Sequence, residues 1–464
     1  MTDTCAAVST ALGKAGVAVI RISGPEAVSI ASKVFKPAGG KTLAGIQANH
    51  AIYGSIYGAD GEKIDTGIAT LFLAPHSYTG EDVAEISCHG SPVGVSLILA
   101  SLFACGARQA LPGEFTKRAF INGKLDLTQA EAVAELLDAE NSSQLKLFSA
   151  QLGGALGKRI REISNSISDM LSAVYAYIDY PDEDMSDMSD EEIIDNIISL
   201  RKDLGSLCAT YSTGVAVTKG IHTVIAGTPN TGKSTFFNLL SGFDRAIVTD
   251  IAGTTRDVIT ESIQVSGIKL LISDTAGMHE TEDTVERIGV EKSLEAFEDA
   301  ELLLCVFDGS RNMEQEDCEF AKRAASKQEE KKVIAIINKS DTAQSETFSG
   351  VVEYIRNAGF KHIVLMSAKT GEGKDDFEKA IQDFYPATET DLSGGMIIAN
   401  ARQYAAVVKA AECLDNALTA MKTLTRDMAG LDLEQAMGEL CEADGRKVSE
   451  QIVNNIFSRF CVGK

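Results

Sequence analysis

The sequence has 464 residues, a formal net charge of −23 and 44% hydrophobic residues, which predicts two to four domains with sizeable cores. The negative charge argues against a protein that binds nucleic acid over its whole surface, so any RNA contact must use local basic patches. No uncharged apolar run reaches eighteen residues, the N-terminal residues lack a signal-peptide pattern, and the nine cysteines show no C-x-x-C pairing, which together favour a cytoplasmic protein with free thiols.

Residues 1–120 are predicted to form a compact α+β domain. Short apolar strands are expected at 17–22, 68–73 and 83–88, followed by a helix near 93–104. Three charged residues stand where packing does not need them: Arg21 within an apolar strand, Glu81 after a turn, and Lys124 after Asn122-Gly123. From spacing alone, each is interpreted as a solvated surface charge.

Residues 121–215 are predicted to be helical. Thr128-x-x-Glu131 has the pattern of a capping box that opens an apolar run through Ala139. Gly153-Gly154 predicts a break between helices. A loop is expected over the acidic residues 182–190, then a helix over 191–211 and a linker at 212–214.

Residues 216–382 contain the stretch that dominates the sequence, Gly227-Thr-Pro-Asn-Thr-Gly-Lys-Ser234, between an apolar strand (221–226) and a helix-like segment (235–240). Its spacing, G-x-x-x-x-G-K-S, is that of a P-loop. Glycines allow the backbone N–H groups to curl around phosphate oxygens at a helix N-terminus. Lys233 can then reach the outer phosphates, and the Ser234 hydroxyl can bind Mg²⁺.

Three further motifs follow predicted strands in the same region. Asp274-Thr-Ala-Gly277 supplies a carboxylate for the Mg²⁺ shell. Asn338-Lys-Ser-Asp341 supplies a carboxylate that accepts from the guanine N1–H and amino group, and Ser367-Ala-Lys369 supplies a backbone N–H for the guanine oxygen. Together they predict a GTPase on a mainly parallel sheet, with one antiparallel edge strand from a hairpin over 258–273.

Residues 383–464 return to a helical pattern. An apolar stripe predicts core packing in a bundle, so the GTPase domain is expected to be inserted into a helical domain. Cys461 follows the apolar pair Ile456-Phe457, which is expected to anchor the tail; the residues alone favour a surface thiol, with a nucleophile as the alternative. The stripe consists of Val408, Ala411, Leu414, Leu418, Met421 and Leu424.

Over essentially its whole length the sequence resembles the MnmE (TrmE) family of tRNA-modification GTPases. The most specific segments are Ala246-Ile-Val-Thr-Asp-Ile-Ala-Gly-Thr-Thr-Arg-Asp257 and Cys461-Val-Gly-Lys464. Four further segments agree: Arg21-Ile-Ser-Gly24, Tyr78-Thr-Gly-Glu-Asp82, Leu111-Pro-Gly-Glu-Phe-Thr-Lys-Arg-Ala-Phe120 and Asn122-Gly-Lys-Leu-Asp-Leu127.

The resemblance implies an N-terminal domain that binds 5-formyl- or methylene-tetrahydrofolate and mediates homodimerisation. Arg21, Glu81, Lys124 and Lys464 match its folate-contacting positions. With an FAD-dependent partner, MnmG (GidA), the family builds an aminomethyl-type group on C5 of the wobble uridine of certain tRNAs. Cys461 matches the cysteine that this modification requires.

The resemblance also implies a K⁺-dependent GTPase that dimerises. Met278 stands where Ras-like enzymes carry the water-orienting glutamine. Glu286 matches the carboxylate that positions water, Thr255 a ligand of Mg²⁺, and Asn230 with Thr249, Ile251 and Thr254 a K⁺ site. The motifs and the family pattern together predict as GTP-contacting residues Asn230, Thr231, Gly232, Lys233, Ser234, Thr235, Thr249, Asp250, Ile251, Ala252, Gly253, Thr254, Thr255, Asp274, Thr275, Ala276, Gly277, Asn338, Lys339, Asp341, Ser367, Ala368 and Lys369.

Two other classes of function compete with this prediction. One is a ribosome-assembly or regulatory GTPase resembling Era or Der, without modification chemistry, although no second P-loop and no G-x-x-G RNA clamp follows residue 382. The other is a scaffold whose GTP cycle only rearranges its partners. The presence or absence of the modified wobble uridine separates both from the modification enzyme.

Overall fold

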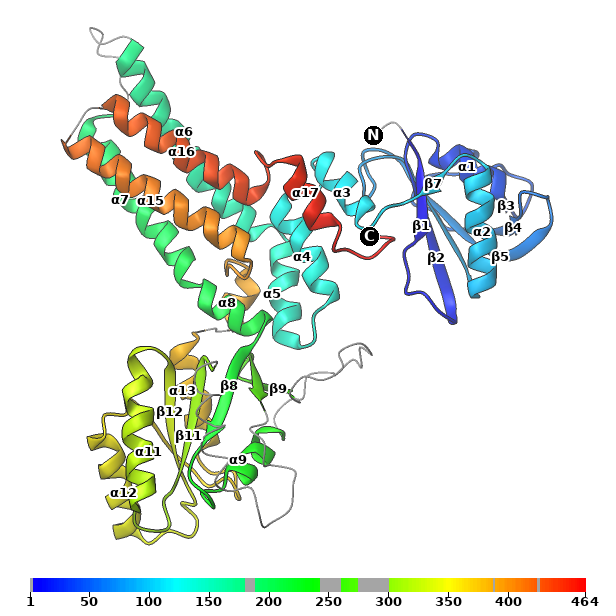
Figure 1. Ribbon diagram of the computed structural model, residues 1–464. Helices are drawn as coiled ribbons and strands as arrows, with labels where there is room; N and C mark the ends of the chain where they lie inside the picture. The colour runs from blue at the N-terminus through cyan, green and yellow to red at the C-terminus, as the bar shows by residue number, and fades with distance from the viewer. Residues whose placement is uncertain (1–2, 180–187, 243–259, 274–299, 387–388, 424–425) are drawn as a thin grey trace. The chain divides into compact units, whose positions relative to one another are not determined.

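The computed structural model describes residues 3–179, 188–242, 260–273, 300–386, 389–423 and 426–464 (Figure 1). The chain divides into two compact units. The first unit consists of Met1–Leu137, Gln151–Ile194 and Glu412–Lys464, and the second of Asp138–Ala150 and Asp195–Ala411. Among the described helices, none combines the length and the apolar composition that crossing a membrane requires.

The N-terminal part of the first unit is built on a seven-stranded sheet. Its strands are β1 Cys5–Val8, β2 Ala15–Ser23, β3 Phe35–Pro37, β4 Ile52–Tyr57, β5 Lys63–Phe72, β6 Val83–Gly90 and β7 Arg108–Gln109. Their order is β3-β4-β5-β6-β2-β1-β7, and only the β1–β7 pair is parallel. Along β2, Ile20 and Ile22 are buried on one face, so Arg21 belongs to the opposite face.

Two helices cover one face of this sheet, α1 Ala27–Val34 and α2 Pro92–Ala104. Ile30 and Ile98 of these helices join the strand residues in a single apolar core. The start of α2 is fixed by Ser91, whose side chain accepts from the backbone N–H of Gly94, and by proline at the first helical position. The predicted α+β fold of this region is confirmed.

The rest of the first unit is helical. Helices α6 (Ala155–Asp179) and α16 (Arg426–Asp444) pack along each other, which joins segments from either side of the P-loop region into one body (Figure 1). Gly153-Gly154 breaks the chain between α5 and α6 as predicted, and Gly154 has a φ of 82°. Beyond α1 and α2, the helices that lie wholly in the first unit are α3 Glu114–Ile121, α4 Leu127–Leu137, α6 Ala155–Asp179, α16 Arg426–Asp444 and α17 Glu450–Phe457. Helix α8 Tyr211–Thr218 lies in the second unit, and α5 Ser142–Leu152, α7 Asp190–Ala209 and α15 Ala401–Thr423 each have residues in both units.

The capping box of α4 differs from the prediction. Asp126 Oδ1 accepts from the Gln129 backbone N–H at 2.9 Å, and Gln129 Oε1 accepts from the Asp126 N–H at 3.0 Å. Thr128 lies inside the first turn and donates its hydroxyl to Asp126 at 2.6 Å. The box is therefore Asp126-x-x-Gln129. Asp126 is the residue directly before the helix, and its carboxylate accepts from the Gln129 backbone N–H and from the Thr128 hydroxyl.

The predicted linker at 212–214 is wrong, because these residues lie in α8. A Cβ on Gly214 would lie 2.1 Å from the carbonyl oxygen of Ile398. This glycine therefore permits close packing within the second unit rather than a flexible connection. Of the stripe predicted for 408–424, Ala411 and Leu414 are buried in α15, whereas Val408, Leu418 and Met421 are only half-buried. Leu424 lies outside the described residues, and Val407, Ala410 and Ala417 are buried in addition.

The second unit contains a six-stranded sheet of β8 Ile221–Ala226, β9 Thr260–Val265, β10 Ile268–Ser273, β11 Leu302–Asp308, β12 Lys332–Asn338 and β13 His362–Leu365. Its order is β13-β12-β11-β8-β10-β9, and every pair is parallel except the β9–β10 hairpin. The predicted mainly parallel sheet with one antiparallel edge strand is confirmed.

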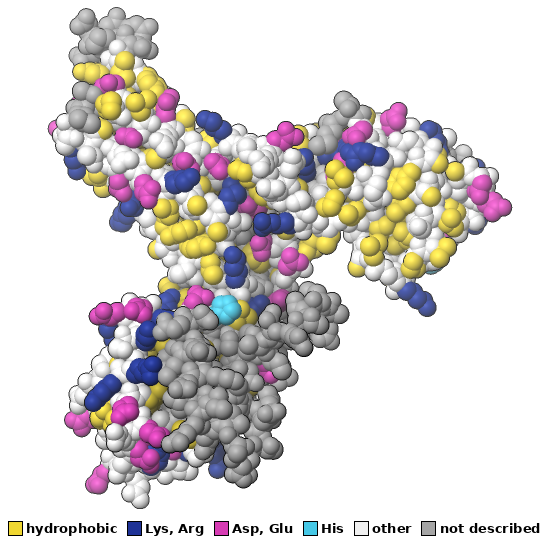
Figure 2. All heavy atoms as spheres, viewed as in Figure 1, with side chains coloured by type: hydrophobic (Ala, Val, Ile, Leu, Met, Phe, Trp, Pro, Cys, Tyr) yellow, Lys and Arg dark blue, Asp and Glu magenta, His cyan; other side chains and the backbone are white. Residues whose placement is uncertain are grey.

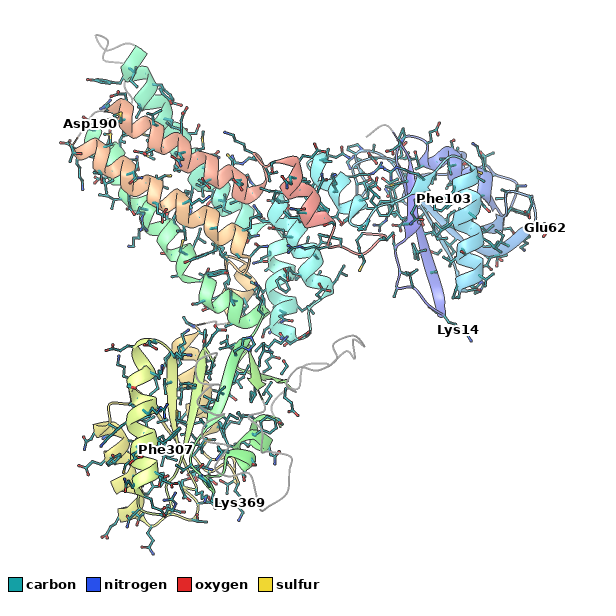
Figure 3. The ribbon with its side chains drawn as sticks, in the orientation of Figure 1. Lys14, Glu62, Phe103, Asp190, Phe307 and Lys369 are labelled. Atoms are coloured by element: carbon teal, nitrogen blue, oxygen red, sulfur yellow. The ribbon has the colours of Figure 1, made fainter. Side chains whose placement is uncertain are left out.

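Helices flank this sheet: α9 Lys233–Leu240, α11 Gln315–Ser326, α12 Ser345–Asn357 and α13 Lys374–Phe384; the short helix α14 Glu389–Gly394 follows α13 along the chain. All seven residues of β11 are buried, as expected for a central parallel strand, and Phe307 lies in the core beside α11 (Figure 3). The carboxyl ends of β8, β11 and β12 meet at one edge of the sheet, where ligands bind in such folds.

Candidate functional site

The P-loop connects β8 to α9 at this edge. Asn230 and Gly232 adopt left-handed backbone angles, with φ of 63° and 91°. A Cβ on Gly232 would lie 2.4 Å from Asn338 Nδ2, so the turn needs glycine for both conformation and space. The loop ends directly in the first turn of α9, which starts at Lys233. Backbone N–H groups and the helix dipole at this point favour phosphate.

The Lys233 ammonium lies inside this turn. Its Nζ donates to the carbonyl oxygens of Gly227 and Thr228, both at 2.9 Å. Thr231 Oγ1 also donates to the Thr228 carbonyl, at 3.0 Å. Ser234 and Thr235 follow in the first helical turn and are exposed, so their hydroxyls are accessible to a phosphate-bound metal ion.

Asn338, at the end of β12, joins three segments of the site. Its Nδ2 donates to the Thr231 carbonyl at 3.0 Å, and its Oδ1 accepts from the Ala368 backbone N–H at 2.9 Å. The side chain is buried, so these two bonds fix the orientation of the amide. The P-loop is thereby held against the predicted guanine-binding motifs.

Lys339 and Asp341 follow Asn338 in the same turn. Lys339 has a φ of 67°, and its Nζ donates to the Asn230 carbonyl at 2.7 Å and to Asp308 Oδ2 at 2.6 Å. Asp341 is exposed, and its Oδ1 accepts from Ser367 Oγ at 2.7 Å. Lys369 is exposed at the edge of the unit near α9 (Figure 3). The two motifs predicted to contact guanine are therefore adjacent.

The sequence did not predict a group of charged side chains that contacts the P-loop from α11 and the segment before it. The Thr228 hydroxyl donates to Asp317 Oδ1, and Asp317 Oδ2 accepts from Arg311 Nη1 at 2.6 Å. Burial opposes ionisation of Asp317 and Asp308, but the Arg311 and Lys339 cations outweigh it and lower the pKa of each carboxyl. The only sequence signal was Asp317 in the first turn of a helix, which is a common stabilising position.

Part of the predicted nucleotide site lies outside the described residues. This holds for the predicted Mg²⁺ ligand Thr255, the water-positioning Glu286, and three of the four predicted K⁺ positions. Residues of the predicted set in this category are Thr249, Asp250, Ile251, Ala252, Gly253, Thr254, Thr255, Asp274, Thr275, Ala276, Gly277 and Glu286.

In the first unit, Arg21 is not a solvated charge as its spacing suggested. Its side chain is 17% exposed, and Nε donates to Glu85 Oε1 at 2.8 Å on the neighbouring strand β6. The guanidinium lies over the rings of Tyr78 and Phe115, 5.0 and 5.4 Å from their centroids. Two aromatic faces and a carboxylate thus hold a planar cation on the side of the sheet opposite α1 and α2.

Glu81 is also held rather than solvated, because it accepts from Arg118 Nη1 at 2.8 Å and from Ser23 Oγ at 3.0 Å. Arg118 is fully buried and also contacts Glu114 Oε1 at 2.7 Å and Asp3 Oδ1 at 3.1 Å. Burial opposes ionisation of Glu114, but Arg108 and Arg118 outweigh it and lower its pKa to about 2. Sequence reasoning missed Arg118, although it lies within the segment 111–120 that carried the family resemblance.

The C-terminal tail is docked onto α3 and β1. The Phe115 backbone N–H donates to the Lys464 carbonyl at 3.0 Å, and the Gly113 N–H donates to the Cys461 carbonyl at 3.3 Å. A Cβ on Gly463 would lie 1.8 Å from the Val8 carbonyl oxygen. The predicted anchoring of the tail is confirmed, with Phe457 buried and the Cys461 side chain exposed.

The tail therefore contacts the helix that carries Phe115 and Arg118, the partners of Arg21 and Glu81. Three of the four predicted folate positions, Arg21, Glu81 and Lys464, are connected in this way through α3. Lys124 stands apart from that network: it is exposed, and its Nζ donates to the Pro75 carbonyl at 3.1 Å, on the loop that precedes Glu81.

Known proteins match the whole chain. The family described as GTP-binding protein TrmE N-terminus matches residues 4–124, and the MnmE helical domain family matches residues 127–461. The tRNA modification GTPase MnmE of Clostridioides difficile (strain 630) is 38% identical over 464 residues, covering 100% of this chain and 99% of that protein. The protein of that name from Alkaliphilus metalliredigens (strain QYMF) is 37% identical over the same shares. Among solved structures, a variant of Aquifex aeolicus Era bound to GDP.AlF4- is 27% identical, with a TM-score of 0.28, covering 42% of this chain and 66% of that chain.

Proposed function

The chain belongs to the MnmE family of tRNA modification GTPases, and we propose that it couples K⁺-dependent GTP hydrolysis to modification of the wobble uridine of certain tRNAs. The observation that carries the proposal is the combination of two arrangements in one chain of this family. The chain has a P-loop tied to both guanine motifs in one unit and, in the other, a tail with an exposed thiol docked on the helix that holds Arg21 and Glu81. A GTPase without modification chemistry has no need of the second arrangement.

In the second unit, the loop N–H groups and Lys233 would bind the phosphates, and Ser234 with Thr255 would hold Mg²⁺. Asp341 accepts from the guanine edge while Asn338 keeps the P-loop in register with it. The Mg²⁺ ion supplies charge neutralisation at the phosphate oxygens. The hydrogen bond from the Thr228 hydroxyl to Asp317 would keep the P-loop backbone in the conformation that surrounds the phosphates.

Hydrolysis in this family's manner also requires groups beyond the P-loop. Asn230, with backbone carbonyls near Thr249, Ile251 and Thr254, would hold K⁺ where other GTPases use an arginine finger. Glu286 would position the attacking water in place of the glutamine that Met278 replaces. Asn230 supports this assignment, because it is exposed at the mouth of the loop, in a turn conformation stabilised by Lys339.

In the first unit, Arg21, Glu81, Lys124 and Lys464 would bind 5-formyl- or methylene-tetrahydrofolate, the source of the one-carbon group. A carboxylate acceptor and an arginine stacked between aromatic rings suit the polar, planar ring system of a folate. Cys461 would be the nucleophile or positioning thiol of the modification, in the cytoplasm, with FAD supplied by the partner protein MnmG (GidA).

The proposed assembly is a homodimer through the N-terminal domain that binds MnmG and tRNA. Apolar side chains exposed on this domain support self-association: Val93 and Leu97 of α2 are 70% and 51% exposed, and Tyr53 is 59% exposed. Figure 2 shows apolar side chains gathered over this part of the first unit. Exposed apolar patches of this kind commonly mark contact surfaces.

Nucleoside analysis of tRNA tests the function. Deletion of the gene should remove the aminomethyl-type group from the wobble uridine, and expression of the unaltered chain should restore it. A Lys233→Ala chain should fail to restore it, because phosphate binding is lost. Normal wobble modification in the deletion strain would instead support a ribosome-assembly or regulatory GTPase.

A further inference from the structure

Two segments of the first unit carry positive charge in an otherwise acidic chain. Residues 446–464 contain four basic residues, Arg446, Lys447, Arg459 and Lys464, and one acidic residue, Glu450. Residues 115–124 contain three basic residues and no acidic residue, whereas the whole chain has 66 acidic and 43 basic residues. Arg118 is buried and paired with Glu81, Glu114 and Asp3, and Arg446 is paired with Asp444, so neither can contact RNA. The remaining cations of the two segments still outnumber Glu450, so the local charge is opposite in sign to the net charge, as an RNA contact on this protein requires.

The two segments lie side by side (Figure 1). Lys117 Nζ on α3 donates to Asn454 Oδ1 on α17 at 2.7 Å, and the rings of Phe120 and Phe457 are 6.2 Å apart. Lys117 therefore stands beside the outer surface of α17. Lys447 lies two residues before the N-cap of this helix, Ser449, and Arg459 directly follows its C-cap, Ser458.

The exposed side of α17 has an unusual composition. Val453 and Phe457 are buried beneath it, and Glu450, the one acidic residue of the helix, is exposed in its first turn. Gln451, Asn454, Asn455 and Ser458 are exposed at helical spacing. We call these four residues, with Lys117, Lys447 and Arg459, the α17 surface. Side-chain amides and hydroxyls donate hydrogen bonds to phosphate and ribose, which an apolar protein-docking face does not provide.

The charges at its two ends are available to a ligand. Within the described part of the chain, neither Lys447 nor Arg459 forms an ion pair, whereas Arg446 is balanced by Asp444 at 2.7 Å. An eight-residue helix is about 12 Å long, so the two cations are spaced for an extended polyanion rather than a single phosphate.

We propose that the α17 surface binds the sugar-phosphate backbone of the tRNA substrate. This inference rests on the proposed function and adds where the RNA is held. The exposed Cys461 stands two residues after Arg459, so RNA bound along α17 has its backbone next to the thiol that the modification is expected to use.

Binding of an unmodified tRNA transcript to the full chain tests the proposal. Fluorescence anisotropy at several salt concentrations would compare the unaltered chain with a Lys447→Gln, Arg459→Gln double variant. The double variant should bind roughly tenfold more weakly per lost cation at about 0.1 M salt, with a salt slope smaller by about 0.7 to 0.9 per cation. The matched control is Lys322→Gln with Arg323→Gln, an equally charged, exposed pair on α11, which should bind like the unaltered chain. GTP hydrolysis should be equal in all three.

Each outcome separates the surface from the function. Tight tRNA binding by both double variants would overturn the α17 surface and leave the proposed function intact. Unchanged tRNA binding with loss of modification only in Lys447→Gln, Arg459→Gln would assign the surface to a protein partner instead. No tRNA binding by the unaltered chain would overturn the surface as an RNA site of this chain; normal wobble modification in a deletion strain would separately overturn the function.

Discussion

Asp341 is the side chain expected to select guanine over adenine. Its Oδ1 accepts a hydrogen bond from Ser367 Oγ at 2.7 Å. The same hydroxyl can donate to the amide oxygen of an asparagine, so Asp341→Asn can keep the side chain in this orientation. Asp341→Asn reverses one hydrogen-bond polarity. GTP should therefore bind roughly 30-fold more weakly or worse, while xanthosine triphosphate should bind better. Titration of the unaltered chain with GTP and ATP is the control. Equal affinities of the unaltered chain for the two nucleotides would contradict the assignment of Asp341 to guanine selection.

Cys461 is expected to act in modification and not in GTP hydrolysis, because it belongs to the first unit and the P-loop to the second. Cys461→Ser replaces a thiol by a far weaker nucleophile near neutral pH. K⁺-stimulated hydrolysis and folate binding should stay near normal, and wobble-uridine modification should disappear. Cys105→Ser, a half-exposed thiol of the same unit, should leave both unchanged. Normal tRNA in cells that carry only Cys461→Ser would reduce Cys461 to a surface thiol.

Among the elements, the docked tail offers a sharper test, because it can be displaced without removing a reactive side chain. Gly463 has a φ of 104°, and its position against the Val8 carbonyl leaves no room for a methyl group. Gly463→Ala should lower modification at least tenfold while Cys461 and Lys464 remain. The control is Gly438→Ala on α16, where a Cβ meets nothing within 4 Å. Equal modification by both variants would show that docking does not position the tail.

Helix α3 should make the first unit sensitive to acid. The folded pKa of Glu114 is about 2, against 4.5 for an ordinary glutamate, so its stabilising contribution is complete above about 4.5 and is lost as pH falls towards 2. Glu114→Gln should cost roughly 2–4 kcal/mol near neutral pH, because buried Arg118 loses a partner. Denaturant unfolding of the full chain should show this difference shrinking as pH falls. Glu450→Gln, an exposed control, should show no such trend.

The elements also show what the sequence could predict. The P-loop, the β9–β10 hairpin and the Gly153-Gly154 break depend on local spacing and turn chemistry, and each was predicted correctly. The burial of Arg118 was not, because its partners Glu81 and Asp3 are 37 and 115 residues away along the chain. The linker predicted at 212–214 was wrong for the same reason: Gly214 allows close contact with the backbone at Ile398, which is distant along the chain, and does not form a flexible connection. Residue roles at the nucleotide and folate sites stay predictions.

At the scale of the whole molecule, catalysis is expected to depend on two copies of the chain. By the family pattern, Met278 stands where Ras-like GTPases carry the water-orienting glutamine. A cation beside the transferring phosphates, held by Asn230, would stabilise the same developing charge as an arginine finger, a contribution worth ~10³–10⁵ in rate. If the cation acts by closing two GTPase units on each other, hydrolysis per chain must rise with dimerisation.

K⁺ should therefore accelerate GTP hydrolysis at least tenfold over Na⁺ at matched ionic strength, and turnover per chain should increase with protein concentration. Asn230→Ala should remove the difference between the two salts. Glu286→Ala should lower turnover while leaving nucleotide affinity nearly intact, because a group used mainly in the transition state contributes little to ground-state binding. Steady-state rates in KCl and NaCl, beside nucleotide titrations of each variant, measure all three effects. Identical turnover in the two salts, at every protein concentration, would mean that each unit hydrolyses GTP alone and by another route.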